Sequence, residues 1–565
     1  MVSFQENHAD CHSVTSGATS EIVMVRTVES CVCSGWLEQF TLHGNEMKKC
    51  GLACRDLRSS SARPSLSKLG TLETRMLGTE QLELKTPFGH LRGLRSDGVA
   101  SFRRVPYAEP PVGDKRFEMP SVAPRWQGVR VATEPGPIPP QLPSRLDAVM
   151  GAYEAKQSED CLHLDIWTTH KPGDLAPVLV FFHGGAFMTG GGSLPCYDGS
   201  VLAKENGLVV VNVSYRLGLL GFWPQPDLGG LNLALHDQVA ALRWIKEAIS
   251  SFGGDPERIT VTGQSAGAFS IAAHLGACQG PELFKRAVMM SAPVGLMCRT
   301  VDQARPTVET VLKVLGLDAG RVEELRAMPL ARIFEGLQTL ASRPPAIKGD
   351  ITPLFMPILD DGNLARQPAD SIAMGSAKWC DVMIGVTREE GAAFTITNAE
   401  LDAVSEDSLR EMFDTRLGGG GEAAIARIRS QRISATPRAI LNELNTDDFF
   451  TGKSLEMAAT QSRLGRNAFV YSFDWQSPNP ALGACHCIDL PFLFGNIDVW
   501  KTSPMLHGAD LNEVRGLSRL YRGAIAAFAA NGDPNDVGLP QWPAYNADWA
   551  VLHFDRRIQA WGYIA

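Results

Sequence analysis

The sequence contains no long hydrophobic run. None of its apolar stretches approaches the roughly 18 residues that a membrane-spanning helix requires. The first residues, MVSFQENHADCHSV, also lack the basic segment and apolar core of a secretory signal. We therefore expect no association with a membrane and no secretion, and we predict a cytoplasmic protein.

An excess of positive charge is also missing. The chain has 53 Lys and Arg against 62 Asp and Glu, which gives a formal net charge of −9. This balance argues against nucleic acid or an anionic membrane as a partner. With 44% hydrophobic and 20% charged residues, the 565-residue chain has the composition of a globular protein with a sizeable core.

The twelve cysteines form no regular framework, which is typical of a reducing compartment. Cys31 and Cys33, with Cys50, Cys54 and His43, could be considered as a metal site. Their spacing matches no standard zinc pattern. We predict no metal and no cofactor.

Residues 1–79 differ in character from the rest of the chain. Ser, Thr and charged residues are frequent there, apolar periodicity is weak, and SSSARPSLS at 59–67 resembles a linker. We predict a poorly ordered N-terminal extension over 1–79 and one folded domain over 80–565. Within that domain, the helix-rich segment 400–465 is expected to cap the sheet.

Buried strands and amphipathic helices alternate in the middle of the chain. VLVFF at 178–182 and LVVVNVSY at 208–215 are unbroken apolar runs, as expected for parallel strands covered on both faces. Apolar residues recur at spacings of three and four over 235–252, which predicts a helix ended by Gly253-Gly254. This order predicts an α/β fold with a mainly parallel central sheet.

The segment VTGQSAGAFS at 261–270 carries the most specific local signal. A strand pattern at 259–261 precedes it, and an Ala-rich helical pattern over 266–277 follows. Gly263 and Gly267 have no Cβ, so strand and helix can approach closely around a sharp turn. This is the G-x-S-x-G nucleophile elbow, which makes Ser265 a candidate nucleophile.

A serine nucleophile needs donors for the oxyanion that forms during acyl transfer. HGGAF at 183–187 directly follows a predicted strand, and Gly184 and Gly185 leave their backbone N–H groups open to a substrate oxygen. The N–H of Ala266, the residue after the nucleophile, is the expected third donor.

The serine also needs a base and an acid that orients it. Folds built around this elbow carry the acid and then the histidine downstream of the serine, which leaves His486, His507 and His553. We favour His486, in the small-residue loop GACHCIDLPF, because His553 lies in a predicted strand and His507 in a polar segment. The acid is expected after the strand at 382–386, at Glu389 or Glu390.

Several blocks of the sequence resemble the type B carboxylesterases, the cholinesterase-like branch of the α/β hydrolases. They span roughly residues 81–560 and read FRRVPYAEPPVGDKRF (102–117), SEDCLHLDIW (158–167), HGGAF, NVSYRLGLLGF (212–222), LHDQVAALRWI (235–245), FGGDPERITVTGQSAG (252–267), GVTREEG (385–391) and CHCIDLPFLFGN (485–496). The last block is most similar to bacterial members of the nitrobenzyl-esterase type.

The resemblance implies an α/β-hydrolase fold with helices on both faces of the sheet and helical cap insertions. It implies the triad Ser265, Glu390 and His486, with Ser291 supporting the acid. Gly184, Gly185 and Ala266 would bind the oxyanion. The family pattern places the acid immediately before a glycine, so Glu390 is expected to face the imidazole, whereas Glu389 is expected to face solvent beside Arg388.

The chain departs from the family at specific positions. Gln264 stands where many relatives have Glu, which removes one negative charge from the site. Cys161 matches a half-cystine of secreted relatives, yet no cysteine lies between residues 55 and 160 to pair with it. Cys487 replaces the usual small residue after the base. The Pro-rich segment 131–157 has no Trp, so a choline ester is not expected.

These observations predict a cofactor-free serine carboxylesterase that forms an acyl-enzyme on Ser265. Its partner would be a small-molecule ester, and the protein would be a monomer or weak homo-oligomer. One alternative keeps the same triad but acts on carbamates, pyrethroids or toxin esters. Another is a non-catalytic adhesion or scaffold protein of the same fold, which the retained triad disfavours.

Overall fold

The structure is a computed structural model that describes residues 78–277, 279–342, 351–360, 362–431, 436–546 and 549–562. The predicted extension over 1–79 lies outside these residues except for its last two positions. The cysteines and histidine between 31 and 54 also lie outside them.

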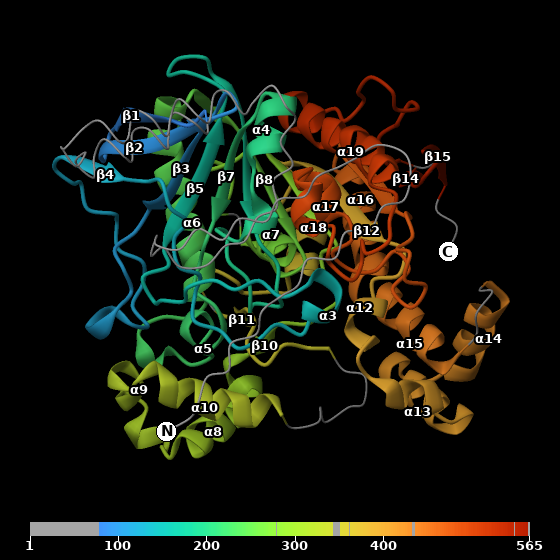
Figure 1. Cartoon of the computed structure of the whole chain (residues 1–565). Helices are drawn as coiled ribbons and strands as arrows, with labels where there is room; N and C mark the ends of the chain where they lie inside the picture. The colour runs from blue at the N-terminus through green and yellow to red at the C-terminus, as the bar shows by residue number, and fades with distance from the viewer. Residues whose placement is uncertain are drawn as a thin grey trace, which may run out of the picture. The chain divides into compact units, whose positions relative to one another are not determined.

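One large mixed sheet organises the described residues (Figure 1). Its strands are β1 Glu80–Thr86, β2 Gly89–Ser96, β3 Val99–Pro106, β4 Val129–Val131, β5 His163–Thr168, β6 Ala176–Phe182, β7 Val209–Val213, β8 Gly254–Gln264, β9 Arg286–Met290, β12 Asp381–Thr387, β13 Ala468–Phe473, β14 Ala550–Phe554 and β15 Gln559–Gly562. They lie in the order β1-β2-β3-β5-β7-β6-β8-β9-β12-β13-β14-β15, and β4 pairs with β2. Strands β10 (Arg299–Thr300) and β11 (Ile358–Leu359) form a separate pair.

The centre of the sheet is parallel, as predicted, and its two ends are antiparallel apart from the parallel pairing of β4 with β2. Every pairing from β7 through β6, β8, β9, β12 and β13 to β14 is parallel. The apolar runs predicted from the sequence are the neighbours β6 and β7, with Val180 opposite Val211. Both residues are fully buried because helices cover both faces of these strands, which explains why the runs do not alternate with polar residues.

Helices cover the sheet on both faces (Figure 1). Helices α4 (Ser200–Asn206), α17 (Leu490–Phe494) and α19 (Leu511–Asn531) share one hydrophobic cluster with the sheet. Helices α6 (Leu233–Ala248), α7 (Ala266–Gly276) and α16 (Gly452–Arg463) belong to the other cluster. The predicted helix over 235–252 is α6 followed by a 3₁₀ turn, and it ends where Gly253 adopts φ +84°.

Further helices connect these layers. They are α3 Asp147–Met150, α5 Gly218–Gly221, α8 Val301–Leu315, α9 Glu324–Ala327, α10 Leu330–Ala341, α11 Pro368–Ala373, α12 Ala392–Thr395, α13 Glu406–Leu417, α14 Gly421–Gln431, α15 Pro437–Asn445 and α18 Ile497–Trp500. None of the helices in the described ranges has the length and apolar character needed to span a membrane.

The helix-rich segment 400–465 divides into two parts. Helices α13, α14 and α15, at the lower right of Figure 1, enclose a small apolar cluster that includes Leu409, Phe413 and Ile440. Helix α16 instead packs on β12 and β13. A π-helical turn, Thr446–Thr451, joins α15 to α16. The segment therefore reaches the sheet through α16 and the turn before it.

Candidate active site

Ser265 occupies a strained turn between β8 and α7. Its backbone has φ +57° and ψ −123°, and its N–H donates to the carbonyl of Met290 at 2.9 Å. A Cβ on Gly263 would lie 2.6 Å from the carbonyl carbon of Gly267, and a Cβ on Gly267 would collide with the carbonyl oxygen of Phe182. The two glycines are therefore required by the close approach of strand and helix, as the sequence predicts.

Glu390 and His486 form a buried pair. Glu390 follows the end of β12, and its Oε2 lies 2.5 Å from Nδ1 of His486. The backbone N–H of Thr387 donates to the other carboxylate oxygen at 2.7 Å. Both side chains are fully buried, and the rings of Phe394 and Phe450 lie 5.0 and 5.1 Å from the imidazole. A carboxylate can only accept hydrogen bonds, so Nδ1 carries the proton and Nε2 is left as an acceptor.

The Nε2 atom of His486 faces the turn that carries Ser265. The side-chain amide nitrogen of Gln264 lies 3.2 Å from Nε2 and 3.4 Å from Sγ of Cys487. Ser265 Oγ makes no hydrogen bond to any described residue, and the serine is 6% exposed. The amide of Gln264 thus occupies the acceptor of the imidazole, next to the serine hydroxyl.

The HGGAF loop lies against Ser265. A Cβ on Gly184 would come within 3.0 Å of the Ser265 Cβ and 2.5 Å of Gln264 Oε1. Gly185 has φ +113°. Within the described ranges, the N–H groups of Gly184, Gly185 and Ala266 donate to no loop or turn carbonyl. The N–H groups of Gly184 and Ala266 therefore belong to residues that adjoin the serine, and that of Gly185 follows in the same loop.

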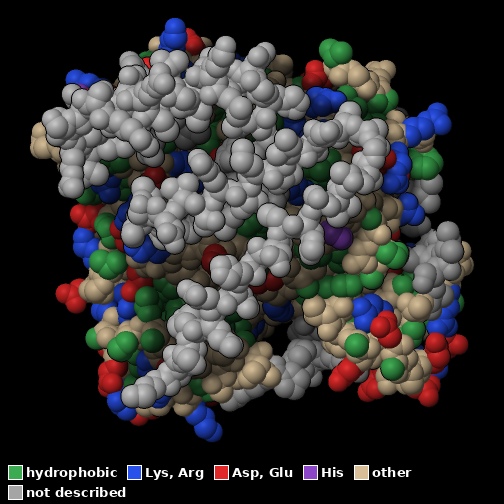
Figure 2. Space-filling model, in the orientation of Figure 1, with side chains coloured by type: hydrophobic (Ala, Val, Ile, Leu, Met, Phe, Trp, Pro, Cys, Tyr) green, Lys and Arg blue, Asp and Glu red, His purple; other side chains and the backbone are tan. Residues whose placement is uncertain are grey.

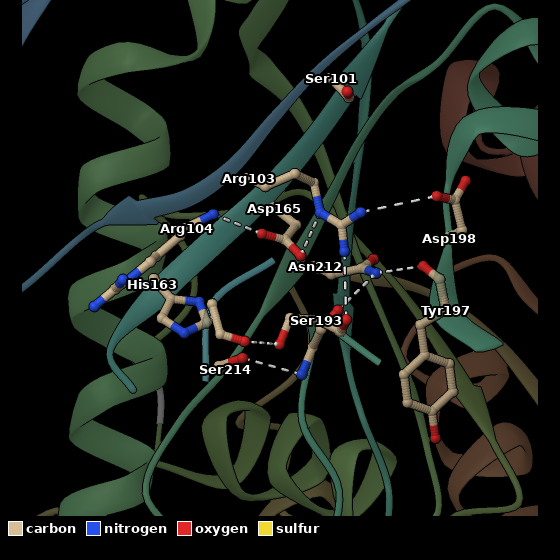
Figure 3. Close-up of polar contacts among 12 residues, drawn as sticks. Ser101, Arg103, Arg104, His163, Asp165, Ser193, Tyr197, Asp198, Asn212 and Ser214 are labelled. Atoms are coloured by element: carbon tan, nitrogen blue, oxygen red, sulfur yellow. Dashed lines mark hydrogen bonds and ion pairs between the residues drawn. The ribbon is translucent and has the colours of Figure 1, made fainter. Parts of the chain in front are cut away.

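A buried polar network holds the segment that follows this loop (Figure 3). Arg103 pairs with Asp165 at 2.8 Å and donates to the carbonyl of Ser193 at 3.3 Å. Asn212, on β7, donates to the carbonyl of Tyr197 at 2.6 Å. Asp165 and Asn212 are both 1% exposed. These residues had no predicted role, because they come together only through the pairing of β3, β5 and β7.

A cavity of about 360 Å³ opens beside the glycines and Gln264. The segment 138–157 forms most of its wall, and Leu194, Tyr197 and Cys487 complete it. Among the described residues that line it, Asp147 and Glu154 carry carboxylates and none is Lys or Arg. Burial raises the pKa of Asp147. The volume is within the usual range of small-molecule sites.

A second carboxylate, Asp489, is buried behind the Glu390–His486 pair. The hydroxyls of Tyr471 and Tyr521 donate to its Oδ2, each at 3.3 Å. Burial, and then the charge of Glu390, raise the pKa of Asp489 to about 7. Its Oδ1 has no hydrogen-bond partner in the described part of the chain. Asp489 was not predicted as a site residue, although it lies only three positions after His486.

The other candidate histidines have different surroundings from His486. His553, on β14, pairs with Asp474 at 2.7 Å, which agrees with the structural role predicted for it. His507 is exposed and lies in a turn. Of the three histidines, His486 is the one whose ring meets both Glu390 and the nucleophile turn.

One expectation about the acid loop was wrong. Glu389 does not face solvent: its side chain is 16% exposed and accepts a hydrogen bond from the N–H of Ala484 at 2.8 Å. The predicted neighbour Arg388 is present, 3.8 Å away. Gly391 has φ −60°, so it is not needed for its backbone conformation. It is needed because a Cβ there would collide with the carbonyl oxygen of Asn442 on α15.

The hydroxyl of Ser291 makes no hydrogen bond to Glu390 in the described part of the chain. The backbone N–H of Ser291 donates to the carbonyl of Gly385 at 2.7 Å. The hydroxyl is fully buried and has no hydrogen-bond partner among the described residues. The support of Glu390 by Ser291 stays a prediction.

The described residues contain no group of three His, Cys, Asp or Glu side chains that could hold a metal ion. Six cysteines fall in the described ranges, and all are buried and free: Cys161, Cys196, Cys298, Cys380, Cys485 and Cys487. The chemistry available at this site is therefore that of a serine hydroxyl, an imidazole, a carboxylate and backbone N–H groups.

Comparison with known proteins agrees with this chemistry. The sequence profile of the carboxylesterase family matches residues 80–560. Phenmedipham hydrolase of Pseudarthrobacter oxydans and para-nitrobenzyl esterase of Bacillus subtilis strain 168 are each 36% identical to the chain, over 82% of it and 92% of their own length. A solved carboxylesterase of Geobacillus stearothermophilus is 33% identical, covers 85% of this chain and 97% of its own, and superposes with a TM-score of 0.75. These relatives have the α/β-hydrolase fold that the sequence predicts here.

Proposed function

We propose, from the premise that this chain belongs to the carboxylesterase family and is a serine carboxylesterase of the nitrobenzyl-esterase type, that Ser265 is its nucleophile, His486 its general base and Glu390 the orienting acid. The observation that carries this proposal is the 2.5 Å contact between Glu390 and Nδ1 of His486, on loops beside the Ser265 turn. A serine hydroxyl is a weak nucleophile until such a base accepts its proton.

In the acylation half, Ser265 Oγ attacks the ester carbonyl carbon while His486 Nε2 takes the hydroxyl proton. The carbonyl oxygen becomes an oxyanion, which the N–H groups of Gly184, Gly185 and Ala266 stabilise. The carbon–oxygen bond to the alcohol then breaks. The leaving alkoxide takes the proton from His486 and departs as the alcohol.

In the deacylation half, a water molecule attacks the acyl-enzyme. His486 accepts one proton from that water and returns it to Ser265 Oγ as the ester bond to the serine breaks. The carboxylic acid leaves and the enzyme is restored. Glu390 stays ionised throughout and stabilises the imidazolium that forms in each half.

Catalysis on this scheme needs one local rearrangement. Nε2 lies against the Gln264 amide, 3.2 Å away, so it must exchange that donor for the Ser265 hydroxyl. Catalytic hydrogen bonds are often long or misaligned without substrate and tighten when substrate binds. We propose that the substrate in the adjoining cavity displaces the Gln264 side chain.

The cavity supports a preference for uncharged esters over esters that carry a carboxylate. Its wall brings Asp147 and Glu154 to the substrate without a lining cation in the described part of the chain. Apolar groups from Ile138, Leu194 and Tyr197 complete it. An anionic substrate would meet like charge there, whereas a neutral acyl or aryl group would fill the apolar wall.

A matched panel tests this preference. We expect kcat/KM to fall steeply from neutral p-nitrophenyl esters to isosteric esters with a terminal carboxylate. Asp147→Asn should reduce the difference in kcat/KM between the neutral and the carboxylate-bearing esters. Carbamates and pyrethroid esters in the same panel test the alternative of a specialised hydrolase. Equal rates for the neutral and anionic esters would contradict the charge preference.

The nucleophile is tested with Ser265→Ala. Loss of a triad nucleophile typically costs on the order of 10⁶ in kcat. A fluorophosphonate probe should label the wild type and fail to label this variant. Ser454→Ala, which removes another buried serine hydroxyl, should keep both labelling and activity. Labelling of Ser265→Ala at another serine would overturn the assignment.

A further inference from the structure

The carboxylate of Glu389 has no part in the mechanism above, yet it is held as firmly as that of its neighbour. Its Oε2 accepts from the backbone N–H of Ala484 at 2.8 Å and from the side-chain amide of Gln476 at 3.1 Å. Its exposed neighbour Arg388 lies 3.8 Å from Oε1. A charge-assisted hydrogen bond from a backbone N–H is stronger than a neutral one.

The backbone of Glu389 contacts the same loop. Its N–H donates to the carbonyl of Ala484 at 2.9 Å, and an isolated parallel bridge pairs Glu389 with Cys485. The backbone N–H and the backbone carbonyl of Ala484 are therefore both hydrogen-bonded to Glu389. Ala484 lies two positions before His486 in the chain.

The two adjacent glutamates hold this loop at two points. Side chains of neighbouring extended residues point in opposite directions. Glu390 meets the imidazole of His486, whereas Glu389 meets the backbone two residues earlier. Gly483, with φ +56°, lets the chain approach: a Cβ there would lie 3.0 Å from the Glu389 carboxylate.

The alternative is that Glu389 only forms a surface ion pair with Arg388 and has no effect on His486. The distances disfavour it, because 3.8 Å to Arg388 is long and the arginine side chain is 63% exposed. Exposed ion pairs contribute little to the stability of the folded state. The short contacts of Glu389 go to Ala484 and Gln476, and both of these lie on the segment that leads to His486.

We propose that Glu389 is a positioning residue that sets the place of His486 by clamping the backbone of Ala484. This rests on the proposed function, because it acts through the base assigned there. The clamp keeps Nδ1 on Glu390 and directs Nε2 toward the Ser265 turn. Misplacement of a catalytic group by about 1 Å can cost about 100-fold in rate.

The test compares three substitutions at this position with p-nitrophenyl acetate as substrate. Glu389→Ala should lower kcat by about 10- to 100-fold with little change in KM. Glu389→Gln should recover most of the rate, because its amide oxygen can still accept from Ala484. Glu389→Asp keeps the charge but is one methylene shorter, and should remain slow. Arg388→Ala is the matched control and should keep the wild-type kcat.

Fluorophosphonate labelling separates this proposal from the assignment of Ser265. If the wild type is not labelled at Ser265, the proposed function fails. If it is labelled, and Glu389→Ala reacts at the same rate with an unchanged kcat, the clamp is overturned. A slower reaction of Glu389→Ala supports it. Should Glu389→Ala fail to fold, the other two variants decide: a faster Gln variant supports the clamp, and equal rates for Gln and Asp overturn it.

Discussion

The side-chain amide of Gln264 donates to Nε2 of His486 across 3.2 Å. Gln264 is 1% exposed and immediately precedes Ser265, so its buried amide occupies the acceptor that the serine hydroxyl needs in the proposed reaction. A glutamine is neutral and can donate, whereas an ionised glutamate can only accept. The residue before the nucleophile thus controls both the charge beside the imidazole and its partner.

Gln264→Glu is expected to move the acid limb of the kcat/KM profile to higher pH. A carboxylate beside the imidazole favours the protonated ring, which cannot accept the Ser265 proton. The limb should move by about one pH unit or more. Gln264→Met, similar in length but without an amide or charge, should not move it upward. An unchanged limb in Gln264→Glu would show that this side chain does not face the base during turnover.

Glu390→Gln is expected to lower kcat by about 10⁴, as an acid-to-amide change does in another serine triad. The amide can offer the imidazole a donor instead of an acceptor, which selects the wrong tautomer. Asp474→Asn breaks a comparable His–carboxylate pair, that of His553, away from Ser265. Measured side by side, the Asp474 variant should keep kcat. A larger loss in Asp474→Asn would move the base to His553.

The free energy of unfolding is expected to fall with acidification. Burial lowers the pKa of His274 to about 4, so its neutral form is retained in the folded state. An unfolded imidazole binds its proton near pH 6.5. The contribution of neutral His274 to the free energy of unfolding is therefore complete above about pH 6.5. It is lost as the pH falls toward 4.

Urea unfolding at pH 7.5 and 5.0 measures this effect. The His274 contribution lost between these values is about 2 kcal/mol, so the pH dependence should be smaller by that amount in His274→Gln. His507→Gln, a change at an exposed turn, should keep the wild-type dependence. Equal pH dependence in the wild type and His274→Gln would contradict the prediction.

Two Gly→Ala substitutions should act in opposite directions. Gly516 lies inside α19 with open space where a Cβ would point, so Gly516→Ala should raise the free energy of unfolding by about 0.5–1 kcal/mol. Gly391→Ala would drive a Cβ into the carbonyl of Asn442 and should lower it by about 1–3 kcal/mol. It should also lower kcat, because Glu390 is the preceding residue. Thermal unfolding of both variants measures the change in stability, and esterase assays of both variants measure the change in kcat.

Surface charge agrees with a small-molecule enzyme. Figure 2 shows acidic and basic side chains intermingled over the visible part of the described surface. This fits the modest net charge of −9 on 565 residues.

Features that depend on a short stretch of chain were predictable from the sequence. The turn at Ser265 follows from Gly263 and Gly267, because the residues that must approach one another are only a few positions apart. The parallel strands β6 and β7 follow from unbroken apolar runs, since burial on both faces leaves no polar position. Likewise, apolar residues at spacings of three and four predicted helix α6.

The partners of each side chain were decided by tertiary structure. Strands β12 and β13 are separated by 80 residues of chain but pair in parallel, and this brings the loops with Glu390 and His486 to the same edge of the sheet. Glu389 was expected to face solvent because Glu390 was expected to face His486 and the side chains of neighbouring extended residues point in opposite directions. Its burial depends on where the 483–487 loop lies, which no local pattern encodes.

The same division holds across the site. Sequence motifs determined which residue types are available: a serine on a tight turn, glycines with free N–H groups, and a histidine and a carboxylate in the right order. Only the folded chain decided that Gln264 meets Nε2 of His486, that Asp489 is buried behind the pair, and that segment 138–157 walls the cavity. Backbone conformation is set by near neighbours, whereas hydrogen-bond partners and burial are set by the order of strands in the sheet, which does not follow the order of the chain.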